Sequence, residues 1–270
     1  MSAVRLPGRL GVCSWSLRAE DPWQLAERAA ACGVDGAWGL ADLRDALDAE
    51  GLQLISGMTS PIGEDYSSLA SIEATGGFRP DATWEENRRL VAGDARAAAE
   101  LELELVTLHA GFLPATPGPE RTKLLDRLRE VADLYGEHGL LLGLETGQES
   151  AATLTDFLDA LDRPDVRVNF DPANLLLYDR DEPLEALEAL LPRVAQIHVK
   201  DARRTREPGT WGEEVPVGSG EVDWRRFAEL LRREGYAGDL VIEREAGEQR
   251  VEDVRAAVAT LAAAFGGTRA

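Results

Sequence analysis

The chain alternates short apolar runs with longer amphipathic segments from one end to the other. Runs of about three to six residues, mostly Leu, Val and Ile, predict eight strands at residues 10–13, 34–38, 52–56, 105–108, 140–144, 166–170, 194–199 and 240–242. Helical periodicity predicts eight helices at residues 22–32, 40–50, 83–100, 120–138, 151–161, 183–190, 224–234 and 251–265. Nearly continuous apolar strands are typical of a parallel sheet buried beneath helices, so the alternation predicts an α/β protein.

Eight strand–helix units in one chain of 270 residues match the count and length of a (β/α)₈ barrel. Gly33, Gly51, Gly139 and Gly235 follow predicted helices, where a left-handed C-cap favours glycine, and Asp223 stands at an expected N-cap. No Pro- or Ser-rich linker divides the chain, so we expect residues 1–270 to form one domain. A doubly wound sheet is the alternative, but no Gly-x-Gly-x-x-Gly follows the first strand. The sequence therefore predicts a single TIM barrel.

Charge and composition narrow the class of partner. The chain carries 49 acidic side chains against 29 Lys and Arg, and this formal net charge of −20 disfavours nucleic acid as a ligand. No apolar run approaches the roughly 18 residues of a membrane helix, and the first residues lack the apolar core of a secretory signal. Cys13 and Cys32 form no Cys-x-x-Cys pair and indicate thiols in a reducing compartment. We expect a cytoplasmic protein that binds neither nucleic acid nor membranes.

Two predicted loops are longer than a barrel requires, at residues 59–82 after the third strand and 201–222 after the seventh. Both belong to the carboxyl-terminal face, where the active sites of such barrels are built. They are either lids or plain surface loops and contacts between copies of the chain. Gly218 and Gly220 indicate loop shaping rather than a phosphate cradle, because no lysine or helix start follows them as in a P-loop.

Ionisable residues end four successive predicted strands. Glu145 ends the fifth, Asp171 follows the sixth, His198 lies in the seventh and Glu243 follows the eighth. One charged residue at a strand end is common, whereas four in a row at the face where substrates bind indicate a site. Since side chains alternate along a strand, an inward-pointing His198 is accompanied by Lys200.

Three carboxylates and one imidazole that converge suit a divalent cation. Oxygen-rich ligation favours Mn²⁺ or Mg²⁺, with Co²⁺, Ni²⁺ and Zn²⁺ as alternatives, at one ion per chain. Such an ion polarises a carbonyl and a neighbouring hydroxyl and acidifies the C–H between them. Glu145 and Glu243, on opposite flanks of the ion, fit the removal and return of that proton.

The same residues stand in motifs that resemble a known family. The motifs are Leu-Glu-Thr at Glu145, Asn-Phe-Asp-Pro-Ala-Asn at Asp171, Ile-His-Val-Lys-Asp at His198, Val-Gly-Ser-Gly-Glu-Val-Asp-Trp ending at Trp224, and Val-Ile-Glu at Glu243. In this order they resemble the xylose-isomerase-like superfamily of sugar isomerases and epimerases. The resemblance covers essentially the whole chain. It implies that Glu145, Asp171, His198 and Glu243 bind one divalent metal and that the two glutamates transfer the proton. From the ligand chemistry, we expect this metal to be Mn²⁺.

The resemblance also implies substrate contacts. His109, in Thr-Leu-His-Ala-Gly, stands where relatives often have a histidine near the substrate, although a satisfied core histidine is the alternative. Arg204 matches an arginine that ketose 3-epimerases carry six residues after the metal histidine. Asn174 occupies the position of their substrate-binding histidine, three residues after the metal aspartate, and departs from the pattern for free ketohexoses.

Two further candidates follow from strand positions. Lys200 would either hold a substrate oxygen or carboxylate or pair with a neighbouring acid such as Asp201. Trp15, at the end of the first strand, would either form an apolar wall for a sugar ring or pack in the core. The related barrel endonucleases that cleave at abasic DNA sites need a trinuclear zinc site rich in histidine, which three histidines in the whole chain cannot build.

We therefore predict a divalent-metal-dependent isomerase or epimerase. Its substrate would be a keto-sugar, sugar acid or related polyol, with glutamate-mediated proton transfer through a metal-stabilised enediolate. The alternative is a metal-dependent lyase, a dehydratase of an inosose-like or keto-acid substrate, because both reactions begin with the same proton abstraction. A non-catalytic sugar-binding barrel is a third class, against which the two flanking glutamates argue. The resemblance also implies a small carbohydrate-like partner and a homo-oligomer.

Overall fold

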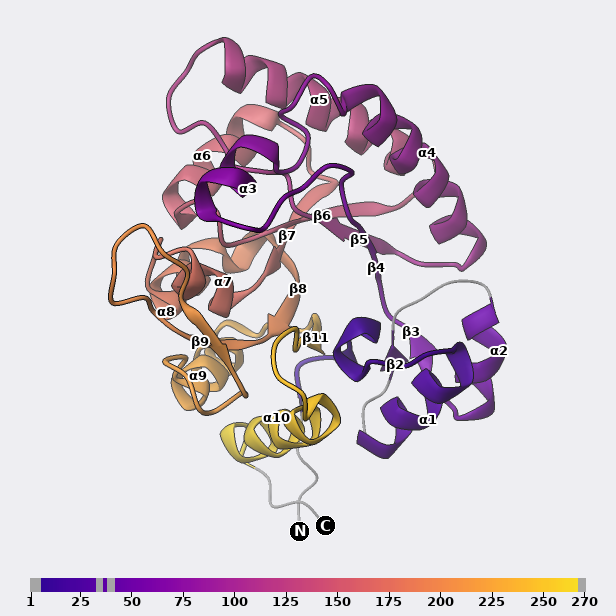
Figure 1. Cartoon of the computed structure of the whole chain (residues 1–270). Coiled ribbons are helices and arrows are strands. Elements are labelled where there is room, and N and C mark those ends of the chain that lie inside the picture. Colours follow the sequence, from indigo (N-terminus) through magenta and orange to yellow (C-terminus); the bar gives the residue numbers. More distant parts are fainter. Residues whose placement is uncertain (1–5, 33–35, 38–41, 267–270) are drawn as a thin grey trace.

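A computed structural model describes residues 6–32, 36–37 and 42–266, and its main sheet is a closed parallel barrel (Figure 1). The strand segments pair in parallel in the order β3-β2-β1-β11-β8-β7-β6-β5-β4. Their bounds are β1 (Leu10–Val12), β2 (Gly36–Ala37), β3 (Gln53–Leu54), β4 (Gly57–Thr59), β5 (Leu105–Leu108), β6 (Leu141–Glu145), β7 (Val166–Phe170), β8 (Val194–Val199) and β11 (Asp239–Ile242). The two outermost segments, β3 and β4, are separated by only two residues of the chain, so the sheet closes on itself.

Helices surround this barrel and contact one another in chain order, from α4 through α5, α6, α8, α9 and α10 to α1 and α2. Their bounds are α1 (Pro22–Cys32), α2 (Asp42–Ala49), α3 (Leu69–Thr75), α4 (Trp84–Glu100), α5 (Pro119–Gly136), α6 (Ala151–Leu161), α7 (Pro172–Leu177), α8 (Pro183–Leu190), α9 (Trp224–Glu234) and α10 (Arg250–Ala264). Short 3₁₀ turns lie at Ser14–Leu17 and Leu191–Arg193. The predicted (β/α)₈ TIM barrel is thus confirmed. None of the helices in the described ranges has the length and apolarity needed to cross a membrane.

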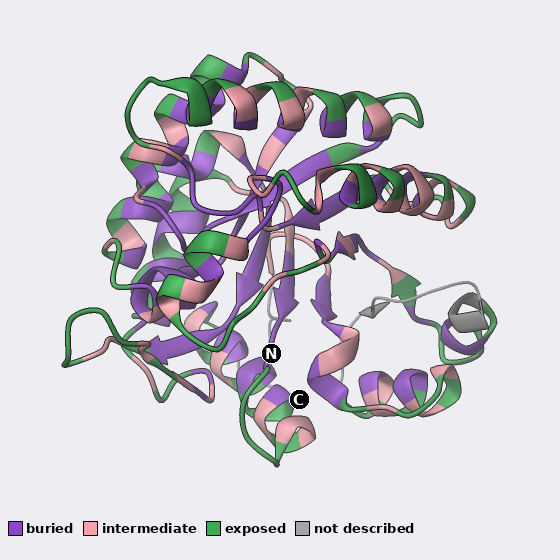
Figure 2. Ribbon diagram, turned by 45° about the horizontal axis from the view of Figure 1, so that its top comes forward, coloured by how far each residue is buried: buried purple, intermediate pink, exposed green. Residues whose placement is uncertain are grey.

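The core lies between the strands and the inner faces of the helices, where Figure 2 shows the buried residues gathered. Predicted helix caps are confirmed. The Asp223 side chain accepts the Arg226 N–H at 3.1 Å, and Gly51, Gly139 and Gly235 have φ of 69°, 75° and 68°. Gly33 lies outside the described residues.

The third predicted strand, 52–56, is wrong as a continuous element. Residues 53–54 pair with β2, and residues 57–59 pair with β5, so the chain changes neighbours at Ile55 and Ser56. Ser56 is buried and donates a hydrogen bond to Gln196 across the barrel interior at 2.7 Å. Thr59, predicted to begin a loop, is instead the last residue of β4.

The two long predicted loops contain regular structure. α3 lies within residues 59–82, and an antiparallel hairpin of β9 (Asp201–Arg203) and β10 (Glu213–Val215) lies within 201–222. The buried Asp201 carboxylate organises the end of the second loop by accepting N–H groups of Gly218 at 2.8 Å and Gly220 and Val222 at 3.2 Å each. A Cβ on Gly220 would come within 2.0 Å of Asp201 Oδ1, so only glycine fits there. The loop-shaping role predicted for these glycines is confirmed.

Candidate functional site

Four buried ionisable side chains meet at the carboxyl-terminal end of the barrel. Glu145 ends β6, Asp171 follows β7, His198 lies in β8 and Glu243 follows β11. One ligand atom from each of the four lies within 4.8 Å of the others. The sequence predicted that these residues converge, and the structure brings them together.

Two atoms of this cluster face each other without hydrogen-bond partners. His198 Nδ1 lies 3.3 Å from Glu145 Oε1, 3.4 Å from Glu243 Oε2 and 3.8 Å from Asp171 Oδ2. Among the described residues, His198 Nδ1 and Asp171 Oδ2 are buried polar atoms with no hydrogen bond. Leaving such atoms unpaired costs roughly 1–3 kcal/mol each. A divalent cation between them would satisfy both, so the donor set fits the predicted metal.

Asp171 owes its orientation to the short helix that follows it. Its Oδ1 accepts the N–H groups of Ala173 at 2.7 Å and Asn174 at 3.0 Å and so caps α7, whose first residue is Pro172. An aspartate N-cap followed by proline at the first helical position is a favourable helix start. The cap uses one carboxylate oxygen and leaves Oδ2 directed at the cluster.

Two asparagines position Glu145. The Asn174 amide donates to Glu145 Oε1 at 3.0 Å, and the Asn169 amide donates to Oε2 at 3.1 Å. The Asn169 amide nitrogen also lies 3.1 Å from His198 Nε2, on the opposite side of the ring from the carboxylates. Polar partners of this kind fix the rotamers of metal-ligating side chains.

Glu243 is held through both of its oxygens. The Trp15 indole N–H donates to Oε1 at 3.1 Å, and the Lys200 ammonium donates to Oε2 at 2.9 Å. Lys200 also pairs with Glu245 and lies 3.9 Å from Asp171 Oδ2. These contacts fix the Glu243 carboxylate at the edge of the cluster.

Electrostatics keep both glutamates ionised. Burial alone would raise the pKa of Glu243, but the charges of Lys200 and His198 outweigh burial and hold it well below its ordinary range. For Glu145, burial is likewise outweighed by His198 and His109, and the pKa is lowered. Burial dominates at Asp171 and raises its pKa to about 6. Two of the cluster's carboxylates, those of Glu145 and Glu243, are therefore ionised and ready to accept a proton.

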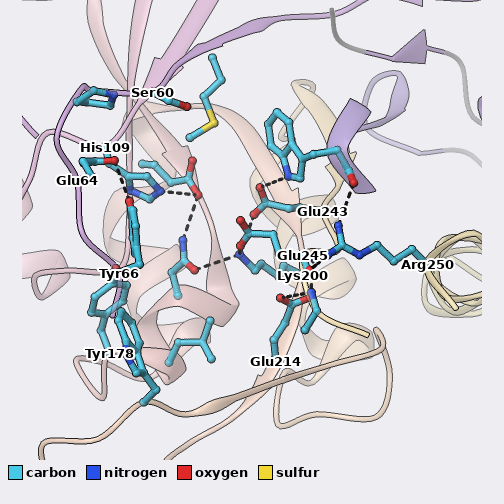
Figure 3. Close-up of a pocket in the computed structure, with 18 residues that line it drawn as sticks. Ser60, Glu64, Tyr66, His109, Tyr178, Lys200, Glu214, Glu243, Glu245 and Arg250 are labelled. Atoms are coloured by element: carbon cyan, nitrogen blue, oxygen red, sulfur yellow. Dashed lines mark hydrogen bonds and ion pairs between the residues drawn. The ribbon is translucent and has the colours of Figure 1, made fainter. Parts of the chain in front are cut away.

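A cavity of about 860 Å³ opens above the cluster (Figure 3). Glu145 and Glu243 form part of its floor, and its walls come from loops that follow several strands. The remaining described lining residues are Trp15, Met58, Ser60, Pro61, Glu64, Tyr66, His109, Asn174, Leu177, Tyr178, Lys200, Trp211, Glu214, Glu245, Ala246 and Arg250.

Four of the five predicted substrate-binding residues line this cavity, namely Trp15, His109, Asn174 and Lys200. The Nε2 atom of His109 lies 3.6 Å from Glu145 Oε1. Its Nδ1 is buried and has no hydrogen-bond partner among the described residues. Of the two alternatives for Lys200, the structure shows the ion pair with neighbouring acids. Its partners are Glu243 and Glu245 rather than Asp201.

Arg204 is not brought to the cluster. The β9–β10 hairpin directs it away from the lining residues, and its guanidinium donates to Asp179 at 2.7 Å and Glu182 at 2.9 Å. The spacing of six residues between His198 and Arg204 does not predict this direction, because β9 lies between them and turns the chain. In this structure Arg204 ties the hairpin to the segment between α7 and α8.

Sequence reasoning missed most of the outer cavity wall. Tyr66 and Trp211 project from connections whose paths carry no apolar periodicity, and Tyr178 directly follows a helix that was not predicted. Arg250 is the first residue of α10, one position before the predicted start of that helix. The aspartate–proline pair at residues 171–172 was an available signal for that helix.

A second cavity, of about 500 Å³, lies beside the first and is lined by Glu149, Arg180 and Gln148 among others. Gln148 donates to the Tyr178 hydroxyl at 3.4 Å, so the two cavities share a wall. Burial raises the pKa of Glu149 to about 8, although the nearby Arg180 charge acts in the opposite direction.

Glu149→Gln should therefore make the protein more stable at alkaline pH relative to the native chain. The folded chain keeps the Glu149 proton until about pH 8, whereas the unfolded chain releases it near the ordinary pKa of 4.5, so the native unfolding free energy falls as pH rises between these values. From about pH 5 to about pH 8.5, the stability difference between variant and native chain should move by about 4 kcal/mol in favour of the variant. Urea unfolding at both pH values measures it. Glu120→Gln, at an exposed position of the same cavity, is the control, and a pH-independent difference for Glu149→Gln would contradict the assignment.

A closed parallel barrel with three carboxylates and an imidazole at its carboxyl-terminal mouth defines a TIM-barrel protein with a candidate metal centre. Residues 16–264 match the model of a family described as xylose isomerase-like TIM barrel, and the chain belongs to this family.

Individual relatives show how far the similarity extends. The L-ribulose-5-phosphate 3-epimerase of Salmonella typhi is 30% identical over 127 residues, which span 46% of this chain and 43% of that protein. A xylose isomerase domain protein from Planctomyces limnophilus has 30% identity and a TM-score of 0.83, over 88% of this chain and 91% of that one. The apo form of 3-keto-D-glucoside 4-epimerase from E. coli has a TM-score of 0.73 over 95% and 99% of the two chains, and its 17% identity shows the fold alone.

Proposed function

We propose that the chain is a divalent-metal-dependent isomerase or epimerase of a keto-sugar, sugar acid or related polyol. The observation that carries the proposal is the buried cluster at the cavity floor, with unpartnered His198 Nδ1 and Asp171 Oδ2 beside two ionised glutamates. The sugar epimerase activities named for a curated relative and for a structural neighbour agree with this reaction class.

Glu145, Asp171, His198 and Glu243 would hold the metal, and the oxygen-rich set favours Mn²⁺. When bound, the metal supplies a Lewis acid that polarises a substrate carbonyl and its neighbouring hydroxyl. Glu145 and Glu243 come from β6 and β11, which are separated by β7 and β8 around the barrel. One carboxylate removes the proton on carbon, and a proton returns from the other side or to the neighbouring carbon. Asn174, Lys200 and His109 reach the same floor and orient the substrate oxygens.

Solvent deuterium incorporation tests this proton transfer. Mn²⁺-loaded protein in D₂O should place one deuterium on a carbon beside the carbonyl of a ketose or ring ketone that it turns over, because a carboxylate proton exchanges with solvent. Mass spectrometry and NMR of the product measure the label. Turnover without label would contradict carboxylate proton transfer, and a product lighter by one water would assign the lyase alternative.

A further inference from the structure

One side of the main cavity is built of aromatic and apolar side chains. This aromatic wall consists of Tyr66, Leu177, Tyr178 and Trp211. Tyr178 packs edge-on against Trp211, with ring centroids 4.7 Å apart, and against Phe112 behind it at 5.9 Å. In Figure 3, Tyr66 and Tyr178 lie together on one side of the pocket, and Glu243 and Arg250 lie on the other.

The aromatic wall is held in place before any ligand arrives. The Gly212 N–H donates to the Leu177 carbonyl at 3.0 Å and fixes the hairpin that carries Trp211 against α7. A Cβ on Gly212 would come within 2.6 Å of the Arg203 carbonyl oxygen, so glycine is required for this approach. The Tyr66 hydroxyl donates to Glu64 at 3.1 Å, and yet 46% of Tyr66 is exposed. A large aromatic surface is therefore presented to the cavity at little entropic cost.

The cavity exceeds what the proposed chemistry alone requires. Pockets for drug-sized ligands measure about 300–1,000 Å³, and this cavity of about 860 Å³ stands in the upper part of that range. A keto-sugar with one ring is smaller than such ligands and would occupy the floor at the four-residue cluster. The space beside the aromatic wall fits a second ring, because aromatic faces pack on the C–H faces of sugar rings and on aromatic rings.

The charge of the lining disfavours a phosphate group. Among the described lining residues, five are glutamates, at positions 64, 145, 214, 243 and 245, and the basic ones are Lys200, Arg250 and His109. Lys200 is paired with two of these glutamates, and Arg250 donates to the backbone carbonyls of Trp15, Gly247 and Glu245. A phosphate in this space would find neither Lys200 nor Arg250 free to bind it, because both described side chains already donate to groups of the chain.

We propose that the substrate is an uncharged glycoside whose second ring, or aromatic aglycone, packs on the aromatic wall. This inference rests on the proposed function, which needs a free carbonyl beside a hydroxyl. In a glycoside of a ketose the carbonyl carbon itself carries the glycosidic bond, so no carbonyl is free. The substrate is therefore a glycoside with a ketone at another ring carbon, placed over the cluster.

Binding of matched probes to the Mn²⁺-loaded protein tests the proposal. The phenyl glycoside of 3-oxo-D-glucose should bind at least about tenfold more tightly than the methyl glycoside, as measured by calorimetry. Trp211→Ala should remove this advantage and leave the methyl glycoside unaffected, whereas Trp211→Phe should keep most of it. Trp23→Ala, at an exposed tryptophan on α1, is the matched control. Tyr66→Ala, at a partly exposed position, provides a second variant if Trp211→Ala does not fold.

The outcomes separate this inference from the proposed function. If ketones are turned over but the phenyl and methyl glycosides bind equally, the aromatic wall is not a binding surface and the proposal is overturned. If D-ribulose 5-phosphate binds more tightly than D-ribulose, the uncharged class is wrong. If nothing is turned over, yet the phenyl advantage depends on Trp211, the proposed function fails and the ring-binding wall stands.

Discussion

Glu243→Gln should leave the barrel folded and lower kcat by at least about 1,000-fold, near the upper range for loss of a general acid or base. Glutamine has the same shape as glutamate. It can still accept the hydrogen bond that the Trp15 N–H donates to Glu243 Oε1 in the native chain. It cannot accept a proton at the pH of the reaction. Lys200 keeps Glu245 as an ion-pair partner in the variant, so no buried cation is left alone. Steady-state kinetics on a substrate identified by deuterium incorporation provides the measurement.

The metal content of Glu243→Gln must be measured beside kcat, because Glu243 is also a proposed ligand. A variant that retains the metal and loses turnover assigns the defect to proton transfer. Glu248→Gln is the matched control, since Glu248 lies on the same connection, pairs with Arg18 and is largely exposed. A Glu243→Gln kcat within about threefold of the native value would exclude Glu243 from proton transfer.

Removing the divalent metal with a chelator should lower turnover by at least about 100-fold, and adding Mn²⁺ or Co²⁺ should restore it. The expected loss reflects the several kcal/mol that Lewis-acid polarisation contributes to such barriers. The metal should also raise the thermal unfolding temperature, because a ligand that binds only the folded state stabilises it. In Asp171→Ala, which removes the unpartnered Oδ2, both effects should disappear.

Two results would contradict the metal prediction. Turnover that persists after the chelator has removed all metal would show that the glutamates act without an ion. An equal rise of the unfolding temperature in the native chain and in Asp171→Ala would show that the ion binds elsewhere.

The barrel and the convergence of the four-residue cluster were predictable because both follow local rules. Apolar strands followed by amphipathic helices leave few topologies, and in a parallel barrel every strand ends at the same face. Glu145, Asp171, His198 and Glu243 lie at such ends, so their meeting follows from strand order alone.

The cavity walls were not predictable in the same way. Arg204 follows His198 at a familiar spacing, but a hairpin stabilised by the buried Asp201 carboxylate turns it toward Asp179. Tyr66 and Trp211 are placed by the connections themselves, whose paths depend on contacts such as the Gly212 N–H to the Leu177 carbonyl. Contacts between segments far apart in the chain produce no periodic pattern in the sequence, so the positions of these side chains could not be predicted from it.

Metal content per chain tests the central claim most directly. Elemental mass spectrometry of the purified protein, after incubation with Mn²⁺ and removal of free ion, should find about one divalent metal per chain in the native protein and almost none in Asp171→Ala. No bound metal in the native protein, or the same amount in Asp171→Ala, would show that Glu145, Asp171, His198 and Glu243 do not form a metal centre.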